Sequence, residues 1–187
     1  MADTATRLPK RLTLREFLEW EERQPGRYEL LDGLVRAMAG GDQAHSAVKR
    51  NILTALHNRL NDGPCRAFDS DLKVLAANNS YYPDAIVDCG EPNPRSRHAS
   101  SPTIVFEVLS PSTREDDFAL KLPNYQATPS IKQIVYVEVN RMHVMLWLRT
   151  DAGWVEDEVV HPDGAVTLEP ISESLPLSEI YTGVRFG

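Results

Sequence analysis

The apolar residues of this chain follow two periods, one helical and one extended, which alternate along the sequence. Apolar positions three and four residues apart predict amphipathic helices, and short apolar runs between turn residues predict strands. Helices are predicted over about 13–23, 43–61 and from Ser112 or Thr113 to about 127. Strands are predicted over 28–31, 34–38, 65–68, 72–75, 83–88, 103–109, 131–139, 142–148, 154–160 and 166–168. This order predicts an α/β (α+β) fold, in which helices flank a central mixed β-sheet and extra antiparallel strands follow at the C-terminus.

Several of these boundaries rest on recognisable residue pairs. Thr13 and Glu16 have the spacing of a capping box at the start of the first helix. Asp32-Gly33 favours the positive φ angles of a tight turn, so the runs on either side are expected to form a β-hairpin. Asp42 is expected to cap the second helix. Thr128-Pro129 is expected to end the third, because the residue before a proline is restricted to extended conformations.

A chain of 187 residues is long enough for one well-cored domain and too short for two independent ones. We therefore expect a single domain over 1–187, with 1–11 as a flexible tail. The stretch Gly90–Ser101 is rich in proline, serine and arginine and has no apolar periodicity, which predicts a loop. Residues 151–187 are expected to extend the sheet as an acidic C-terminal segment.

The pattern also bears on where the protein acts. No run approaches the ~20 apolar residues of a membrane span, and the N-terminus lacks the apolar core of a signal peptide, so we expect a cytoplasmic protein without membrane partners. Cys65 and Cys89 are the only cysteines and form no CxxC pair. We expect them to be buried structural thiols, and a disulfide between them is not expected.

The formal net charge of −7 is concentrated near the C-terminus. Residues 151–187 carry eight acidic side chains against a single basic one, Arg185, and the preceding part of the chain is neutral. No strong basic patch is visible, so tight non-specific binding to DNA or RNA is not indicated.

Two carboxylates stand where the pattern predicts buried strands. Glu107 lies inside the apolar run 103–109, and Asp84 opens the strand after Pro83. An unpaired carboxylate in such a place is costly, so it is expected to hold a metal, pair with a cation or act as an acid or base. If the two strands are neighbours, the carboxylates converge at one sheet edge. With water and a backbone carbonyl they would make an oxygen-rich site suited to Mg²⁺ or Mn²⁺.

Other polar residues have two interpretations each. Lys121 shares a predicted helix face with Asp117 and Tyr125, so it either reaches the carboxylate site or forms an ordinary surface ion pair with Asp117. Glu29 is either a solvated strand residue or part of the site. The stretch 110–113 either caps the following helix or also receives a phosphate.

Some catalytic classes are disfavoured by the motifs. His45 and His57 have no HxxxH or HExxH partner, which argues against zinc. A GxSxG elbow is absent, which argues against a serine hydrolase.

A longer set of motifs points to a known family. In order, the chain contains Tyr28-Glu29-Leu30-Leu31-Asp32-Gly33, Tyr82-Pro83-Asp84, Glu107-Val108-Leu109-Ser110-Pro111-Ser112-Thr113, Asp117, Lys121, Tyr125 and Pro129-Ser130. The pair formed by Pro83-Asp84 and the later Glu107 resembles the signature of the PD-(D/E)XK superfamily, which has the restriction-endonuclease-like fold. The full set, over about 12–150, resembles the Uma-two family of putative restriction endonucleases.

The resemblance implies a metal-dependent phosphodiesterase centre. In it, Asp84 and Glu107 bind Mg²⁺, the backbone carbonyl of Val108 completes the protein ligands, and Glu29 lies at the same site. One departure stands out, because Leu109 occupies the position two residues after Glu107 where the superfamily has lysine. Lys121 on the helix is the position that matches instead. Gln133 and Ile134 are a further departure, where family members more often carry Glu and Tyr.

Two classes of function follow from these observations. The first is a Mg²⁺-dependent endonuclease that hydrolyses DNA phosphodiester bonds, with Mn²⁺ able to substitute, through catalytic Asp84, Glu107, Lys121 and Glu29. The second is a nuclease-fold binding or assembly module, which is expected to be a homodimer. The absence of a strong basic patch and the acidic C-terminal segment favour this second class. A third alternative is an enzyme that uses the same ion on another phosphorylated or carboxylated substrate.

Overall fold

The structure, a computed structural model of the chain, describes residues 11–38, 40–60, 63–110 and 114–186. The predicted tail therefore lies outside the described residues except for Arg11. The predicted start of the third helix at Ser112 or Thr113 also lies outside them. None of the described helices is long and apolar enough to cross a membrane.

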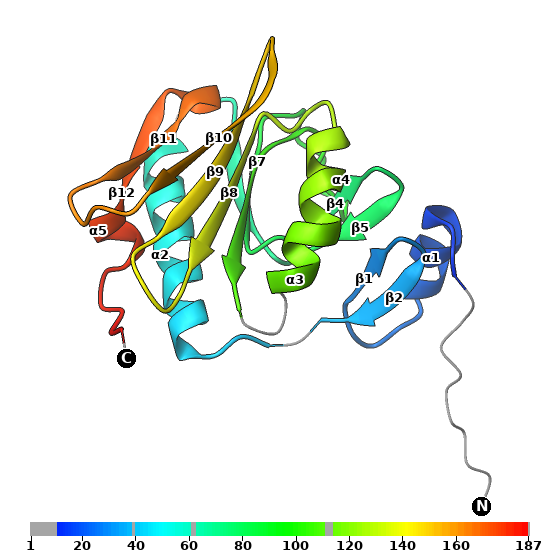
Figure 1. Ribbon diagram of the computed structural model, residues 1–187. Coiled ribbons are helices and arrows are strands. Elements are labelled where there is room, and N and C mark those ends of the chain that lie inside the picture. The colour runs from blue at the N-terminus through cyan, green and yellow to red at the C-terminus, as the bar shows by residue number, and fades with distance from the viewer. Residues whose placement is uncertain (1–10, 39, 61–62, 111–113, 187) are drawn as a thin grey trace, which may run out of the picture.

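Within the described residues, the largest sheet has six strands in the order β10-β9-β8-β7-β6-β3. Their bounds are β3 Arg66–Asp69, β6 Ala85–Asp88, β7 Pro102–Leu109, β8 Gln133–Glu138, β9 Val144–Thr150 and β10 Gly153–Val159. The central strands β7 and β8 run parallel, and the other neighbours are antiparallel. The predicted central mixed sheet is therefore confirmed (Figure 1).

A second sheet in the described part has four antiparallel strands in the order β2-β1-β5-β4. Their bounds are β1 Tyr28–Leu31, β2 Leu34–Ala37, β4 Val74–Ala76 and β5 Asn79–Tyr81. Asp32 and Gly33 have φ angles of 47° and 83°, which confirms the predicted tight turn between β1 and β2. The chain passes from β5 in this sheet to β6 in the large one through Tyr82, Pro83 and Asp84 alone.

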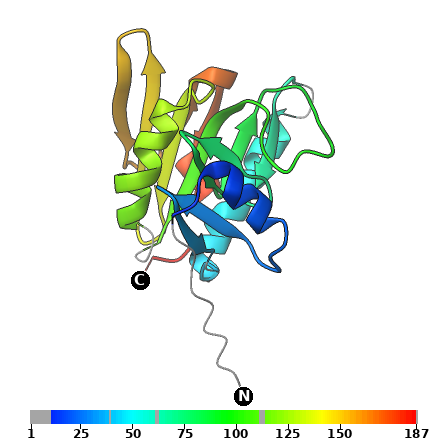
Figure 2. The same cartoon turned by 90° about the vertical axis from the view of Figure 1, so that its right-hand side faces the viewer.

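Helices cover both faces of the large sheet (Figures 1 and 2). The long helix α2 (Gln43–Leu60) packs on one face, with Val48, Ile52 and Leu56 fully buried against the sheet. The other face is covered by α3 (Arg114–Asp116), a π-helical turn (Asp117–Lys121) and α4 (Leu122–Ala127). The third helix is therefore present, but its predicted regular α form is wrong at the π turn.

The N-terminal helix α1 (Leu14–Glu21) packs beside β1. The side chain of Thr13 accepts the Glu16 N–H, and the Glu16 carboxylate accepts the Thr13 N–H at 2.8 Å, so the predicted capping box is confirmed. The carboxylate of Asp42 likewise accepts the His45 N–H at 2.8 Å at the start of α2. Both helix starts follow from side-chain oxygens that satisfy backbone N–H groups in the first turn.

The C-terminal segment only partly extends the large sheet. Strand β10 is its edge, as expected, whereas β11 (Ala165–Leu168) pairs with β12 (Glu173–Pro176), a strand that the pattern did not predict. A 3-10 turn (Glu169–Ile171) joins them, and α5 (Leu177–Ile180) follows. Apolar residues of this unit pack with α2, so β11 belongs to the core beside that helix rather than to the sheet.

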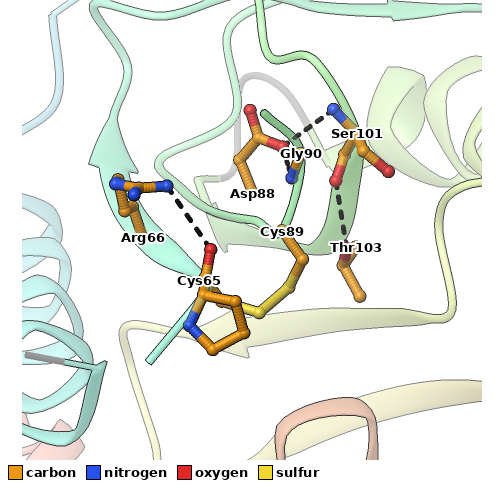
Figure 3. The surroundings of a disulfide bond; sticks show 8 residues. Cys65, Arg66, Asp88, Cys89, Gly90, Ser101 and Thr103 are labelled. Atoms are coloured by element: carbon orange, nitrogen blue, oxygen red, sulfur yellow. Dashed lines mark hydrogen bonds between the residues drawn. A yellow bond between two sulfur atoms is a disulfide. The ribbon is translucent and has the colours of Figure 1, made fainter. Parts of the chain in front are cut away.

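The prediction of two free thiols is wrong, because Cys65 and Cys89 form a disulfide (Figure 3). Strands β3 and β6 are antiparallel neighbours in which Arg66 faces Asp88, so the next pair outward is Cys65 and Cys89. The two residues are 24 apart in the sequence, and only the strand register shows that they meet. The adjacent Asp88 carboxylate accepts the N–H groups of Gly90 and Ser101, which ties the predicted loop to the end of β6.

Candidate active site

Asp84 and Glu107 lie side by side where β6 begins and β7 approaches its end. The register of these strands pairs Ala85 with Phe106, and one further step along it places Asp84 opposite Glu107. Oδ2 of Asp84 accepts the N–H of Val108 at 2.9 Å, which fixes the carboxylate against β7. The predicted convergence of the two carboxylates is therefore present in the structure.

Glu107 is 4% exposed and points to the face of the sheet that α4 covers. Its Oε1 atom accepts the Tyr125 hydroxyl at 2.7 Å and lies 3.3 Å from Nζ of Lys121. Both contacts fall on one oxygen. No hydrogen bond from a described residue reaches Oε2.

Three carboxylates of the described residues surround the buried ammonium of Lys121. The distances from Nζ are 3.2 Å to Glu29, 3.3 Å to Glu107 and 3.2 Å to Asp117. The lysine is 6% exposed, so the alternative of a surface ion pair with Asp117 is wrong. Glu29 is 7% exposed, so its alternative as a solvated strand residue is wrong as well.

The π turn explains how one helix presents so many side chains to one point. In an α-helix, residues four apart are displaced by about 40° around the axis, so a series such as 117, 121 and 125 drifts off one face. A π turn has more residues per turn than an α-helix, so two residues four apart are rotated about the axis in the opposite direction. The π turn over Asp117–Lys121 therefore offsets the drift, and Tyr125 still faces Glu107.

The electrostatics of the cluster follow from burial and charge. Burial raises the pKa of Glu107 well above its ordinary value, and the Lys121 ammonium opposes that shift only in part. Burial acts to lower the pKa of Lys121, but the Glu107, Glu29 and Asp117 carboxylates together raise it well above its ordinary value. Lys121 therefore stays cationic at neutral pH, beside the three carboxyl groups.

Helix α2 supplies two site residues that the sequence pattern missed. Nε2 of His45 lies 3.2 Å from Oδ2 of Asp84, and Nζ of Lys49 lies 3.9 Å from Oδ1. The hydrogen bond to Asp84 raises the pKa of His45, although burial opposes it. The signal was a basic pair four residues apart just after Asp42, but nothing local to α2 indicated that it meets the distant Pro83-Asp84 segment.

A cavity of about 210 Å³ joins these groups. Its lining includes the side chains of both sheets and of both helical layers: Glu29, Arg36, His45, Asp84, Glu107, Ser110, Asp117 and Lys121. Of the stretch predicted to cap a helix or receive a phosphate, only Ser110 is among the described residues, so the phosphate alternative stays a prediction.

The donor set fits a hard divalent cation. Among the described residues, no three or more His, Cys, Asp or Glu side chains are grouped to hold a metal ion. The set at this cavity instead has two carboxylates, Asp84 and Glu107, with the carbonyl of Val108. The N–H of Val108 points toward β6, where Asp84 accepts it, and the carbonyl of the same residue points in the same direction. The register places Pro83 opposite Val108, and proline has no N–H that could donate to this carbonyl. Mg²⁺ commonly uses one or two carboxylates and keeps several waters.

Comparison with known proteins places this chain in a family. The model of the Uma2 family, described as "Putative restriction endonuclease", matches residues 14–178. The chain belongs to the Uma2 family. An uncharacterized protein of Synechocystis sp. is 33% identical over 183 residues, covering 94% of each chain. A second uncharacterized Synechocystis protein is 29% identical over 134 residues, covering 69% of this chain and 76% of its own length.

A solved structure shares the fold of this Uma2 chain. It is the crystal structure of a putative nuclease belonging to DUF820 from Anabaena variabilis, with a TM-score of 0.74 and 17% sequence identity, and it covers 93% of this chain and 99% of that one. The predicted family and its α/β fold are therefore confirmed. Within this Uma2 chain, Leu109 is buried in the apolar layer beneath α4, so the lysine at the site comes from the helix rather than from β7.

Proposed function

We propose that this Uma2 protein is a metal-dependent nuclease that hydrolyses DNA phosphodiester bonds at the cavity between the two sheets. The observation that carries the proposal is the meeting of Asp84 and Glu107 beside a buried lysine. Asp84, Glu107 and the Val108 carbonyl would hold Mg²⁺ or Mn²⁺. When bound, the ion supplies Lewis-acid stabilisation of the charge that develops on the phosphate under attack.

The chain's own groups have distinct tasks in this proposal. Tyr125 donates to Oε1 of Glu107 and so fixes the orientation of that carboxylate. Lys121 places a fixed positive charge beside the cavity, where it can stabilise negative charge on the substrate. Glu29, on the small sheet, also lies 3.2 Å from the ammonium, so that Lys121 is held by carboxylates of both sheets.

The test is cleavage of supercoiled plasmid by the purified protein with Mg²⁺ or Mn²⁺. Wild type is expected to nick the plasmid, and Asp84→Asn and Glu107→Gln are expected to abolish nicking. Glu115→Gln is the matched control, because Glu115 is an exposed carboxylate on α3. Absence of nicking by wild type, or equal nicking by the Asp84 and Glu107 variants, would overturn the enzymatic function.

A second function, a nuclease-fold binding or assembly module, is favoured by the charge distribution. Acidic side chains dominate residues 151–187, and the large sheet has β3 and β10 as its edges, with Val155 52% exposed on β10. An edge strand can pair with a second copy of the chain. Calorimetric titration with Mn²⁺ and sedimentation distinguish the two functions. A protein that dimerises and binds no Mn²⁺ is the module, whereas Mn²⁺ binding that Glu107→Gln abolishes supports the enzyme.

A further inference from the structure

A second buried ion pair lies near the cavity and has no part in the proposed hydrolysis. It joins the carboxylate of Glu21, at the end of α1, to the ammonium of Lys73, just before β4. Both residues are 6% exposed. Tyr82 lines the active-site cavity and also a second hollow next to Glu21 and Lys73, so this residue lies between the two.

The Glu21 carboxylate connects three separate segments of the chain. Its Oε2 atom binds Lys73. Its Oε1 atom accepts the hydroxyl of Tyr82 at 2.8 Å and the backbone N–H of Tyr28 at 3.3 Å.

Each donor leads directly to a residue of the proposed active site. Tyr28 is followed by Glu29 on β1. Tyr82 donates its own backbone N–H to Oε1 of Glu29 at 3.0 Å, and two residues later comes Asp84. Pro83 fixes its own φ angle and restricts the residue before it, so the link from Tyr82 to Asp84 is stiff. The position of the Tyr82 ring therefore bears on both carboxylates.

Stability alone gives a poor reason for such a pair. Burying two charges carries a desolvation cost that their attraction often fails to exceed, and well-packed apolar residues can replace a buried pair at no loss of stability. We propose that Glu21 is a positioning residue, which acts through Tyr82 to hold Glu29 and Asp84 in the geometry of the active site. Lys73 supplies the opposite charge that burial of the Glu21 carboxylate requires. The proposal deepens the nuclease function and, for its effect on catalysis, rests on it.

Two double variants test the proposal, because they differ in one acceptor oxygen. The glutamine double variant, Glu21→Gln/Lys73→Met, removes both charges but keeps an oxygen for the Tyr82 hydroxyl and the Tyr28 N–H. The leucine double variant, Glu21→Leu/Lys73→Met, removes both charges and that oxygen as well. Amide hydrogen exchange in the metal-free protein reports positioning through Tyr82, whose N–H is bound to Glu29, and Val108, whose N–H is bound to Asp84.

In the leucine double variant, the exchange protection of these two amides is expected to fall by about tenfold or more, while strand β8 keeps its protection. The Mn²⁺ dissociation constant is expected to rise by about tenfold to a hundredfold, as for other residues that orient metal ligands. The glutamine double variant is expected to restore both values to near those of wild type. Arg59→Met is the matched control, since it breaks an ion pair with Glu179 far from the cavity.

Unchanged protection of the Tyr82 and Val108 amides in the leucine double variant would overturn the positioning role. Equal losses in the two double variants would also overturn it, because they would show that the buried charges matter and the acceptor does not. The exchange measurement needs no metal and no activity. A wild-type protein that binds no Mn²⁺ would therefore overturn the nuclease function and leave the exchange result to decide the role of Glu21.

Discussion

Nζ of Lys121 lies 3.3 Å from Oε1 of Glu107, although the lysine belongs to the helical layer and the glutamate to the central strand β7. Both side chains are almost completely buried. A charge in such a place is tolerated only when a partner of opposite sign is close. Helix and sheet are thus linked by an ion pair at the position where the active site is proposed.

Lys121→Met is expected to destabilise the fold, because it leaves Glu29, Glu107 and Asp117 without their shared cation. Removal of one member of a buried ion pair typically costs about 3–5 kcal/mol. Urea denaturation at neutral pH measures the change in the free energy of unfolding. A double variant, Lys121→Met/Glu107→Gln, is expected to recover part of the loss, since it removes one uncompensated charge.

The matched control for Lys121 is an exposed pair. Arg15 and Glu19 are 3.0 Å apart on the surface of α1, with side chains 89% and 60% exposed. Arg15→Met is expected to change stability by less than about 1 kcal/mol. A Lys121→Met protein as stable as Arg15→Met would contradict the burial of the lysine among carboxylates.

Tyr125→Phe is expected to lower stability without disturbing the packing of α4. Tyr125 is fully buried, and its hydroxyl donates to Oε1 of Glu107 at 2.7 Å. Deletion of the donor leaves a buried acceptor short of one hydrogen bond, which costs about 1–3 kcal/mol. The free energy of unfolding in urea is the measurement. Tyr28→Phe, at a half-buried position, serves as the comparison and should change it less.

Reduction of the Cys65–Cys89 disulfide is expected to destabilise the protein. The bond joins residues 24 apart in the sequence, and loss of a native disulfide typically costs about 2–4 kcal/mol. Urea unfolding with and without reductant measures this loss, and Cys65→Ala/Cys89→Ala should show no response to reductant. Alkylation of unreduced, denatured protein gives an independent check, since two reactive thiols per chain would contradict the bond.

Glu138 is expected to make stability depend on pH in the acidic range. The hydrogen bonds from Arg141 lower the pKa of Glu138; burial opposes this, and Arg114 assists it. The folded-state pKa therefore lies below the unfolded one. Its contribution is full above the unfolded value and is lost as the pH falls through the folded value.

The measurement for Glu138 is urea unfolding over a series of pH values. The stability difference between wild type and Glu138→Gln is expected to be largest near neutral pH and to shrink in acid. Arg141→Gln should weaken this dependence, because it removes the contact that contributes most to the lowered pKa. A difference that grows as the pH falls would contradict the assignment.

Local signals in the sequence were sufficient for most of the fold. The Asp32-Gly33 turn, the capping box at Thr13 and the cap at Asp42 depend on residues a few positions apart, so their structures could be predicted. The Cys65–Cys89 bond and the separate pairing of β11 with β12 depend on strand register and tertiary packing. In each case, the sequence of one segment contains no local signal that identifies the segment with which it pairs.

The candidate site divides in the same way. Glu107 and Asp84 could be singled out because a charge in an apolar run is anomalous by itself. His45 and Lys49 could not, since they lie on an ordinary amphipathic helix, and their meeting with Asp84 depends on how α2 packs. The π turn at Lys121 could not be predicted either. It changes the direction in which the following side chains point, but it has no characteristic residue composition.

The brief passage of the chain from the small sheet to the large one has a consequence for cooperativity. The core between α2 and the large sheet contains no described residue of β1, β2, β4 or β5, so it can persist when the small sheet opens. Such a partial unfolding would carry Glu29 away from Lys121 and from the N–H of Tyr82, while Asp84 stays next to β6 in the large sheet. Because Leu31, Val74, Ala76 and Tyr81 of the small sheet pack in the core beneath α4, opening of this sheet would also expose that core. The proposed site would then come apart while the core beneath α2 stays folded.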